Sequence, residues 1–78
     1  MQLSYDPRYN AAYLKFHEKT TEVESVRVSD ALIVDLAPDG TIYGIELLNA
    51  NEQLHGKEAA RLIVTNEATG KMAEVLLP

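Results

Sequence analysis

Short segments in which apolar and polar side chains alternate, each ended by turn-forming residues, run through most of the chain. A period of two residues is typical of β-strands, because successive side chains point to opposite faces of a sheet. The predicted strands cover residues 2–5, 11–17, 22–28, 31–37 and 41–48. The pattern therefore predicts a mainly β fold, an antiparallel β-meander of about five strands.

Turn residues mark the connections between these strands. Asp6-Pro7 ends the first strand, because proline disfavours a helical residue before it and the Asp6 carboxylate can cap the turn. Pro38-Asp39-Gly40 is the clearest hairpin signal. Proline suits the second position of a type I turn, and glycine suits the left-handed residue after it.

The alternation changes phase inside the third segment. Val23 falls on the face opposite to Val26 and Val28, which predicts a β-bulge near Glu24-Ser25. The fourth and fifth segments are apolar on both faces for part of their length, unlike strands of a sheet with one solvated face. We therefore expect the C-terminal segment or a second subunit to cover the second face.

Residues after the fifth strand fit two different structures. Residues 57–63 can be written as a helix with apolar side chains three and four positions apart. Residues 61–77 can instead be written as a hairpin around the turn Asn66–Gly70. β-Branched residues in the first arm, and Gly70 at a position suited to positive φ, favour the hairpin. We predict a C-terminal hairpin, with a short C-terminal helix packing on the sheet as the alternative.

Length and charge limit the possible functions. With 78 residues and no cysteine, the chain is expected to form one small domain, residues 1–78, held by packing alone or with a second subunit. A net charge of −5 argues against nucleic-acid binding, which needs clustered lysine and arginine. The N-terminus has no signal-peptide pattern, and no apolar run reaches the length of a membrane span. We therefore expect a cytoplasmic protein that binds neither nucleic acids nor membranes.

The ionisable residues form no known catalytic or metal-binding motif. His17 and His55 are isolated in the sequence, so we predict no metal site. Asp6, Asp30 and Asp39 fall at turns and are expected to stabilise them. We assign no catalytic, cofactor-binding or metal-ligating residue.

Asp35 and Glu46 differ from the other acidic residues because each lies inside an apolar strand. If they share a face, their repulsion would raise the pKa of at least one of them, and paired carboxylates can carry out acid–base chemistry. The simpler interpretation is that they lie on the solvated face of the sheet.

The four tyrosines offer a second possible site. Together they would form an aromatic binding patch of the kind enriched at interfaces. The simpler interpretation, which we prefer, places Tyr5 and Tyr43 at the edge of the core and Tyr9 and Tyr13 in solvent.

Several segments of the chain together match the pattern of one protein family. These segments are Tyr5-Asp6-Pro7, Ala11-Ala12-Tyr13-Leu14-Lys15-Phe16, Leu32-Ile33-Val34-Asp35-Leu36, Asp39-Gly40 and Tyr43-Gly44-Ile45-Glu46-Leu47-Leu48-Asn49-Ala50. In this order they resemble the small, mainly bacterial family called domain of unknown function 2283. The resemblance covers residues 2–51, leaves residues 52–78 as a C-terminal extension, and implies an antiparallel β-meander.

The resemblance implies little about activity, because none is established for the family and no catalytic residues can be carried over. Some relatives look like partners of small toxin-like proteins, which implies an antitoxin or immunity role. We therefore predict a protein-binding module without a cofactor. It would act as a homodimer or as an antitoxin-like partner of another small protein. The alternative is a small-ligand-binding domain or an enzyme that uses Asp35 and Glu46.

Overall fold

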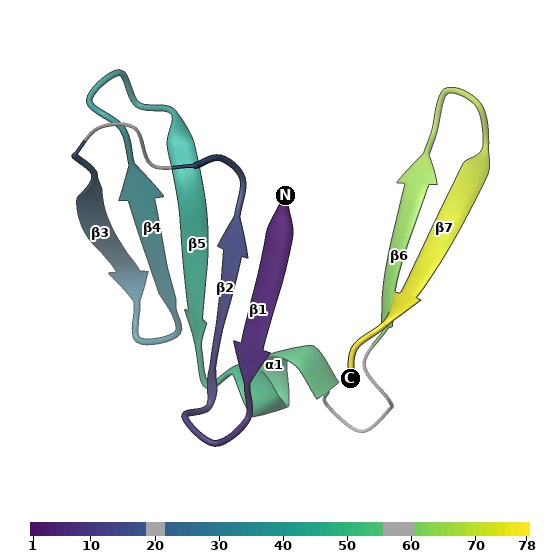
Figure 1. Ribbon diagram of the computed structural model, residues 1–78, viewed down its shortest axis with the longest axis horizontal. Helices are drawn as coiled ribbons and strands as arrows, with labels where there is room; N and C mark the ends of the chain where they lie inside the picture. The colour runs from purple at the N-terminus through teal and green to yellow at the C-terminus, as the bar shows by residue number, and fades with distance from the viewer. Residues whose placement is uncertain (19–21, 56–60) are drawn as a thin grey trace.

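Seven strands and one short helix make up the computed structural model, which describes residues 1–18, 22–55 and 61–78 (Figure 1). In chain order they are β1 (Gln2–Asp6), β2 (Ala11–Lys15), β3 (Glu24–Ser29), β4 (Leu32–Leu36), β5 (Ile42–Leu48), α1 (Ala50–His55), β6 (Arg61–Asn66) and β7 (Lys71–Leu76). Strands β1 to β5 form one antiparallel sheet, and β6 pairs with β7 in a separate hairpin. The predicted mainly β fold, with five antiparallel strands and a C-terminal hairpin, is confirmed.

The order of the strands in the sheet is β1-β2-β5-β4-β3. A meander would place β3 beside β2, so the predicted meander is wrong at this one connection. Strand β3, which follows β2 in the sequence, lies at the far edge of the sheet, and β5 takes the place beside β2. The apolar strand β5 is thus central, whereas β3, exposed at every residue, lies at an edge. Alternation assigns side chains to faces but does not assign strands to neighbours, so the sequence pattern could not give this order.

The register of the sheet sorts its side chains onto two contrasting faces. The apolar face has a first row of Leu3, Leu14, Ile45, Val34 and Val26, and a second row of Tyr5, Ala12, Leu47 and Leu32. The opposite, polar face has one row of Ser4, Tyr13, Glu46, Ile33 and Arg27, and another of Gln2, Lys15, Gly44, Asp35 and Ser25. The apolar face carries no charged residue in these two rows.

The predicted bulge exists in β3, but at a different position. The register shifts between Arg27 and Ser29, where the strand approaches its turn into β4. The placement near Glu24-Ser25 was wrong because Val23 precedes the strand, so its phase is not constrained by the sheet.

The turn at Pro38-Asp39-Gly40 is as predicted. The Gly40 amide donates to the Ala37 carbonyl at 2.9 Å, and Gly40 has φ = 87°. The Asp39 carboxylate accepts a hydrogen bond of 2.9 Å from the amide of Thr41. Its bonds with Thr41 lower the pKa of Asp39. The turn therefore depends on local chemistry that the sequence displays directly.

Helix α1 was not predicted, and it follows β5 directly. Asn49 and Glu52 have the spacing of a capping box, and Asn49 Nδ2 donates to Glu52 Oε2 at 3.0 Å. The helix packs at the end of β2, where Ala12 and Ala50 are both buried. It is neither long nor apolar enough to cross a membrane, and no other helix occurs in the described residues.

The C-terminal hairpin formed by β6 and β7 is confirmed. Its turn closes with the Gly70 amide donating to the Asn66 carbonyl at 2.7 Å, and Gly70 has φ = 77° as predicted. The alternative helix over residues 57–63 is wrong for 61–63, which belong to β6. Residues 57–60 of that alternative lie outside the described part of the chain.

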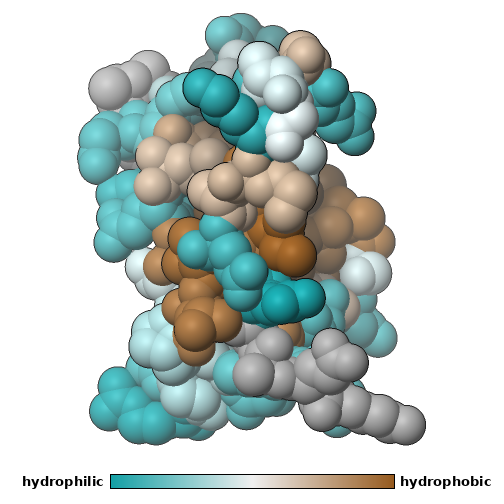
Figure 2. Space-filling model, turned by 90° about the vertical axis from the view of Figure 1, so that its right-hand side faces the viewer, coloured by the Kyte–Doolittle hydropathy of each residue, from teal (hydrophilic) through white to brown (hydrophobic). Residues whose placement is uncertain are grey.

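The hairpin and the sheet leave much apolar surface uncovered. Among the described residues, the buried hydrophobic ones are Ala12, Tyr43 and Ala50. Viewed from the side on which the hairpin lies, hydrophobic side chains gather across the middle of the surface (Figure 2). The radius of gyration is 14.1 Å, whereas a compact chain of this length would have roughly 11.5 Å. The hairpin therefore increases the radius of gyration but contributes no residue to the buried core.

Candidate functional site

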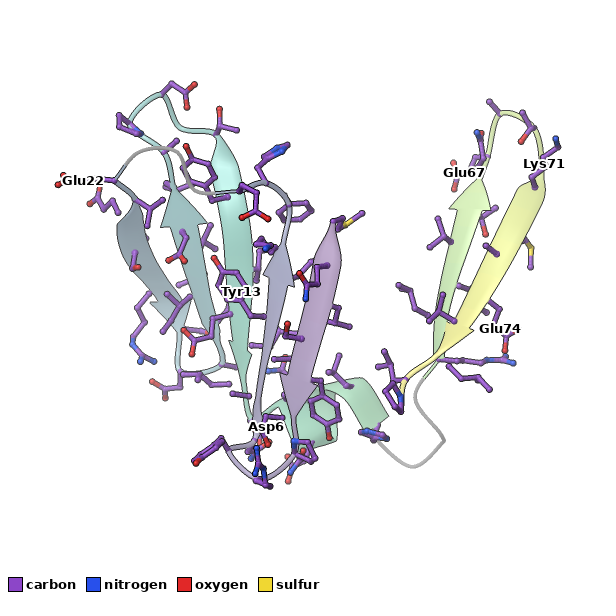
Figure 3. The ribbon with its side chains drawn as sticks, viewed as in Figure 1. Asp6, Tyr13, Glu22, Glu67, Lys71 and Glu74 are labelled. Carbon is purple, nitrogen blue, oxygen red and sulfur yellow. The ribbon has the colours of Figure 1, made fainter. Side chains whose placement is uncertain are left out.

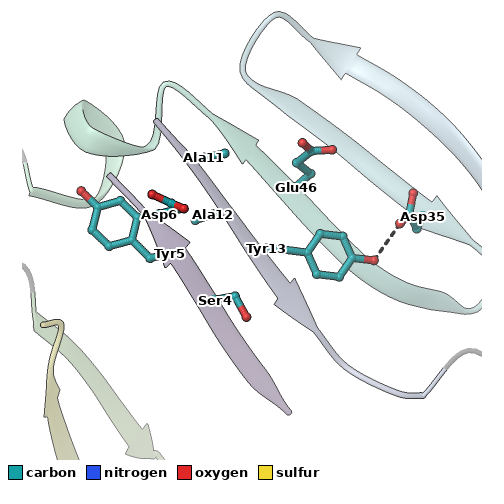
Figure 4. Close-up of a pocket in the computed structure, with 8 residues that line it drawn as sticks. All are labelled: Ser4, Tyr5, Asp6, Ala11, Ala12, Tyr13, Asp35 and Glu46. Atoms are coloured by element: carbon teal, nitrogen blue, oxygen red, sulfur yellow. Dashed lines mark hydrogen bonds between the residues drawn. The ribbon is translucent and has the colours of Figure 1, made fainter. Parts of the chain in front are cut away.

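The most buried charged group of the described residues is the Asp35 carboxylate, on the polar face of the sheet. Its side chain belongs to a residue only 8% exposed. Asp35 Oδ2 accepts a hydrogen bond of 2.7 Å from the Tyr13 hydroxyl (Figure 4). Asp35 Oδ1 accepts one of 2.6 Å from the Ser25 hydroxyl. The expectation that Asp35 lies on a solvated face was therefore wrong. A carboxylate at this depth needs such donors, because burying a charge without partners is costly.

Tyr13 reaches Asp35 by lying across Gly44. Gly44 is directly opposite Asp35 in β4 and opposite Lys15 in β2. A Cβ atom at Gly44 would lie 2.5 Å from Tyr13 Cζ, so only glycine leaves room for the ring. Figure 3 shows Tyr13 over the middle of the sheet. Tyr13 is half-buried rather than exposed, which corrects the sequence-based expectation.

The surroundings of Tyr13 keep its hydroxyl protonated. Burial is the largest cause, and the hydrogen bond to Asp35 and the charges of Asp35 and Glu46 add to it, raising the pKa of Tyr13 to about 12. The phenol is therefore a permanent hydrogen-bond donor at neutral pH and cannot act as a base. Its role here is to satisfy the buried carboxylate.

Replacing Tyr13 by phenylalanine should remove a late step of tyrosine ionisation, near pH 12. Folding favours the protonated form of the Tyr13 hydroxyl. This form therefore stabilises the folded protein fully below pH 10, and the stabilisation is lost as the pH rises from 10 to about 12. Ultraviolet absorbance of phenolate, followed during an alkaline titration, measures this directly. Tyr9→Phe is the control, because Tyr9 is 77% exposed, and it should leave the late step unchanged. A late step that persists in Tyr13→Phe would contradict the assignment.

A shallow hollow of about 610 Å³ lies beside this network on the sheet. It is lined by Ser4, Tyr5, Asp6, Ala11, Ala12, Tyr13, Asp35 and Glu46 (Figure 4). Asp35 and Glu46 share the polar face, in adjacent rows, as the sequence hypothesis required. Asp35, however, is held by the hydroxyls of Tyr13 and Ser25. The hollow thus contains carboxylates, but the buried one already has hydrogen-bond donors.

The other acidic turn residues and the histidines have separate positions. Asp6 Oδ1 accepts a bond of 2.9 Å from the Arg8 amide, and the Arg8 guanidinium, 2.8 Å from Asp6 Oδ2, lowers the pKa of Asp6. Asp30 lies in the turn between β3 and β4. His17 is exposed, whereas His55 lies against Tyr5 with ring centroids 5.4 Å apart. No three His, Asp or Glu residues of the described chain are grouped to hold a metal ion.

A cluster that the sequence reasoning missed joins the β1–β2 loop to helix α1. Asn10, at φ = 54°, accepts a hydrogen bond of 3.1 Å from the Ala50 amide on its carbonyl and one of 2.7 Å from the Asn51 amide on Oδ1. The Tyr5 hydroxyl donates to Asn51 Oδ1 at 2.6 Å, and Asn51 Nδ2 donates to the Pro7 carbonyl at 3.2 Å. These contacts join the β1–β2 loop to the first residues of α1, so they hold the helix against the sheet.

The tyrosines do not form one patch. Tyr5 belongs to the apolar face and Tyr13 to the polar face, so they lie on opposite sides of the sheet. Tyr9 is exposed, and Tyr43 is buried at the register shift between β4 and β5. The predictions for Tyr5, Tyr9 and Tyr43 are confirmed.

A further candidate interaction surface is the apolar face. In its first row only Val26, on the edge strand, is classed as exposed, and the other four side chains are half-buried. No described element outside the sheet forms a layer over that row, because α1 packs at the end of β2 and β6 and β7 pair only with each other. Apolar side chains, half-buried or exposed, therefore form a row across the full width of the sheet.

Comparison with known proteins agrees with this architecture. The family model described as "Protein of unknown function (DUF2283)" matches residues 2–51, which span β1 to the start of α1. No curated protein and no solved structure matches the chain. Because the match covers most of the chain, and all five sheet strands lie within it, the chain belongs to the DUF2283 family of proteins of unknown function.

Proposed function

We propose that this chain is a protein-binding module whose binding surface is the apolar face of the five-stranded sheet. We further propose that the bound protein is a second copy of the same chain. The observation that supports both statements is the amount of surface that one chain leaves in solvent. It can be compared with the surface that folded monomers of this size expose.

The chain has an accessible surface of 6052 Å² and a mass of 8.6 kDa. Surface scaling gives roughly 4,700 Å² for a folded monomer of this mass, an excess of roughly 1,350 Å² in this chain. Stable obligate dimers bury about 1,000 to 2,500 Å² per subunit. The excess surface therefore lies within the range that one subunit of such a dimer buries.

The apolar face suits this role better than the polar face. Its first row is continuous over all five strands, from Leu3 at one edge to Val26 at the other, without a charged group. Charged residues are depleted in the core of protein interfaces. On the polar face, the Asp35 carboxylate would have to be covered together with Glu46, Lys15 and Arg27, which is unfavourable for an apolar contact.

An antitoxin-like role is the second form of this proposal. A net charge of −5 would attract a basic partner, and the same apolar face would then bind another small protein. A location in the bacterial cytoplasm, where such partners act, stays a prediction.

Size-exclusion chromatography with light scattering tests the homodimer. At tens of micromolar, we expect a mass of about 17 kDa, twice that of the chain. Val34→Lys should give a monomer, because it places a charge in the middle of the apolar face. Ile33→Lys is the matched control. Ile33 is the preceding residue of β4 and is also half-buried, but it belongs to the polar face, so this variant should remain a dimer.

A mass near 8.6 kDa for the unmodified chain would contradict the proposal. If Val34→Lys fails to fold, Val26→Lys repeats the test at the edge of the same row, where the side chain is 38% exposed. A stable complex with a different protein would favour the antitoxin-like form, provided that Val34→Lys abolishes it.

A small-ligand site or an enzyme at Asp35 and Glu46 is the alternative that the hollow beside Tyr13 favours. Such a site would bind its ligand saturably and lose it in Asp35→Asn and Glu46→Gln. The protein-binding module instead keeps its dimer in Glu46→Gln, because Glu46 lies on the polar face.

A further inference from the structure

We infer that the β6–β7 hairpin is an exchanged arm, which lies on the apolar sheet face of a second copy while the second copy's hairpin lies on the sheet of the first. This inference rests on the proposed homodimer and specifies which segment forms the contact. Four features of the hairpin support it.

One face of the hairpin is apolar except at its turn. In its register Leu62 is opposite Val75, and Val64 is opposite Ala73, so these four side chains share a face. Asn66 and Lys71 follow on the same face only at the end of the hairpin, beside the turn. The other face is mixed, because Arg61 Nη1 forms an ion pair of 3.5 Å with Glu74 Oε1 there. Hairpins with one apolar and one charged face are built to lie on another apolar layer.

In the described part of the chain, no element buries that face of the hairpin. All twelve residues of its two strands are exposed, and Leu62, Val64 and Val75 are 50%, 54% and 52% exposed. An isolated two-stranded hairpin is at best marginally stable in water, and a further layer is needed to stabilise it. A covering surface is therefore required by the hairpin as much as by the sheet.

The two surfaces match in chemistry and size. Neither the four apolar hairpin residues nor the first row of the sheet includes a charge, so their contact would bury none. The hairpin strands have six residues each, and the sheet strands have five to seven. Two sheets stack face to face with about 10 Å between them, which side chains from both layers fill.

The position of the hairpin indicates that the covering surface belongs to another copy. Figure 1 shows β6 and β7 beyond β1, on the side of β1 away from β2, so the hairpin covers neither face of its own sheet. Helix α1, which precedes it, is fixed at this edge by the bonds of Asn51 with Tyr5 and Asn10. An arm that extends past the edge of its own sheet can reach a second molecule, and reciprocal exchange gives a closed symmetric dimer.

Paired lysine variants in the hairpin provide the first test. Leu62→Lys charges the apolar hairpin face and should weaken the dimer tenfold or more, seen as a shift of mass toward 8.6 kDa on dilution. Ile63→Lys is the control, because Ile63 is 44% exposed but lies on the other face, opposite Glu74. It should leave the dimer unchanged. Equal behaviour of the two variants would overturn the inference.

Cross-linking distinguishes an exchanged arm from one that folds back on its own sheet. The chain has no cysteine, so Val34→Cys on the sheet and Val64→Cys on the hairpin each introduce a single thiol. The two variants, one of them labelled with ¹⁵N, are mixed, allowed to exchange subunits and treated with a short bis-maleimide. We expect a covalent heterodimer whose cross-linked peptides carry one labelled and one unlabelled partner. The doubly substituted chain supplies the comparison.

The outcomes separate this inference from the proposed function. A monomeric unmodified chain would overturn both. A dimer that survives Leu62→Lys and gives no hairpin-to-sheet cross-link would overturn only the exchanged arm. A cross-link confined to single chains of the doubly substituted variant would show that the hairpin folds back, which also overturns the inference.

Discussion

Replacing Gly44 by alanine should lower the free energy of unfolding by about 2 kcal/mol. The added Cβ would meet Tyr13 at 2.5 Å from Cζ and 2.7 Å from Cε1, so the ring must leave its place over the strand. The hydrogen bond from its hydroxyl to Asp35 is then lost, and a bond to a buried charged group contributes about 1.5 to 3 kcal/mol. Alanine recovers about 0.5 to 1 kcal/mol of that loss, because it loses less backbone conformational entropy than glycine when the strand forms.

The same substitution should have the opposite sign once Tyr13 is removed. In a Tyr13→Ala background the ring no longer occupies the space above Gly44, so Gly44→Ala should stabilise the protein by about 0.5 to 1 kcal/mol. Urea denaturation followed by circular dichroism gives both values, with the protein concentration held constant because dimerisation contributes to stability. A loss of similar size in both backgrounds would show that Gly44 is required for a reason other than the Tyr13 ring.

Local conformational chemistry was the part of this fold that the sequence could predict. Gly40 and Gly70 both adopt the positive φ expected of them, because the turn type and the residue type constrain each other within a few positions. The strands and the C-terminal hairpin followed from alternation and from β-branched residues such as Ile63 and Val64. Each of these features depends on residues that are neighbours in the sequence.

The environment of Asp35 could not be predicted in the same way. Its burial depends on Tyr13 from β2 and Ser25 from β3, which reach it from opposite sides. Tyr13 reaches it only because β5 stands between β2 and β4, with Gly44 at the crossing point. The alternation pattern carries no information on that strand order, so Tyr13 was expected in solvent.

Helix α1 was missed for a related reason. Six residues are too few for a helical period to be recognised, and the Asn49–Glu52 spacing was the only local signal. Much of what fixes this helix comes from Asn10, in a loop that precedes β2. Contacts of this kind join segments far apart in the sequence, so a pattern of neighbouring residues does not reveal them.

Substitutions at Asn10 should show how strongly these contacts hold the helix. Asn10→Val should destabilise the protein by about 2 to 4 kcal/mol, because two costs combine. A β-branched residue is strained at φ = 54°, and the acceptor for the Asn51 amide is lost.

Two further variants separate these two costs. Asn10→Gly accommodates the positive φ but lacks the acceptor, so it should lose about 1 kcal/mol. Asn10→Asp keeps both the acceptor and a side chain that tolerates the left-handed region, but it loses the 3.3 Å bond that Asn10 Nδ2 donates to Asn49 Oδ1. It should therefore cost less than Asn10→Gly, which loses both side-chain bonds. Denaturant midpoints measured at one protein concentration rank the three. If valine and glycine cost the same, backbone strain contributes nothing at this position, and the lost hydrogen bonds of the Asn10 side chain account for the whole effect.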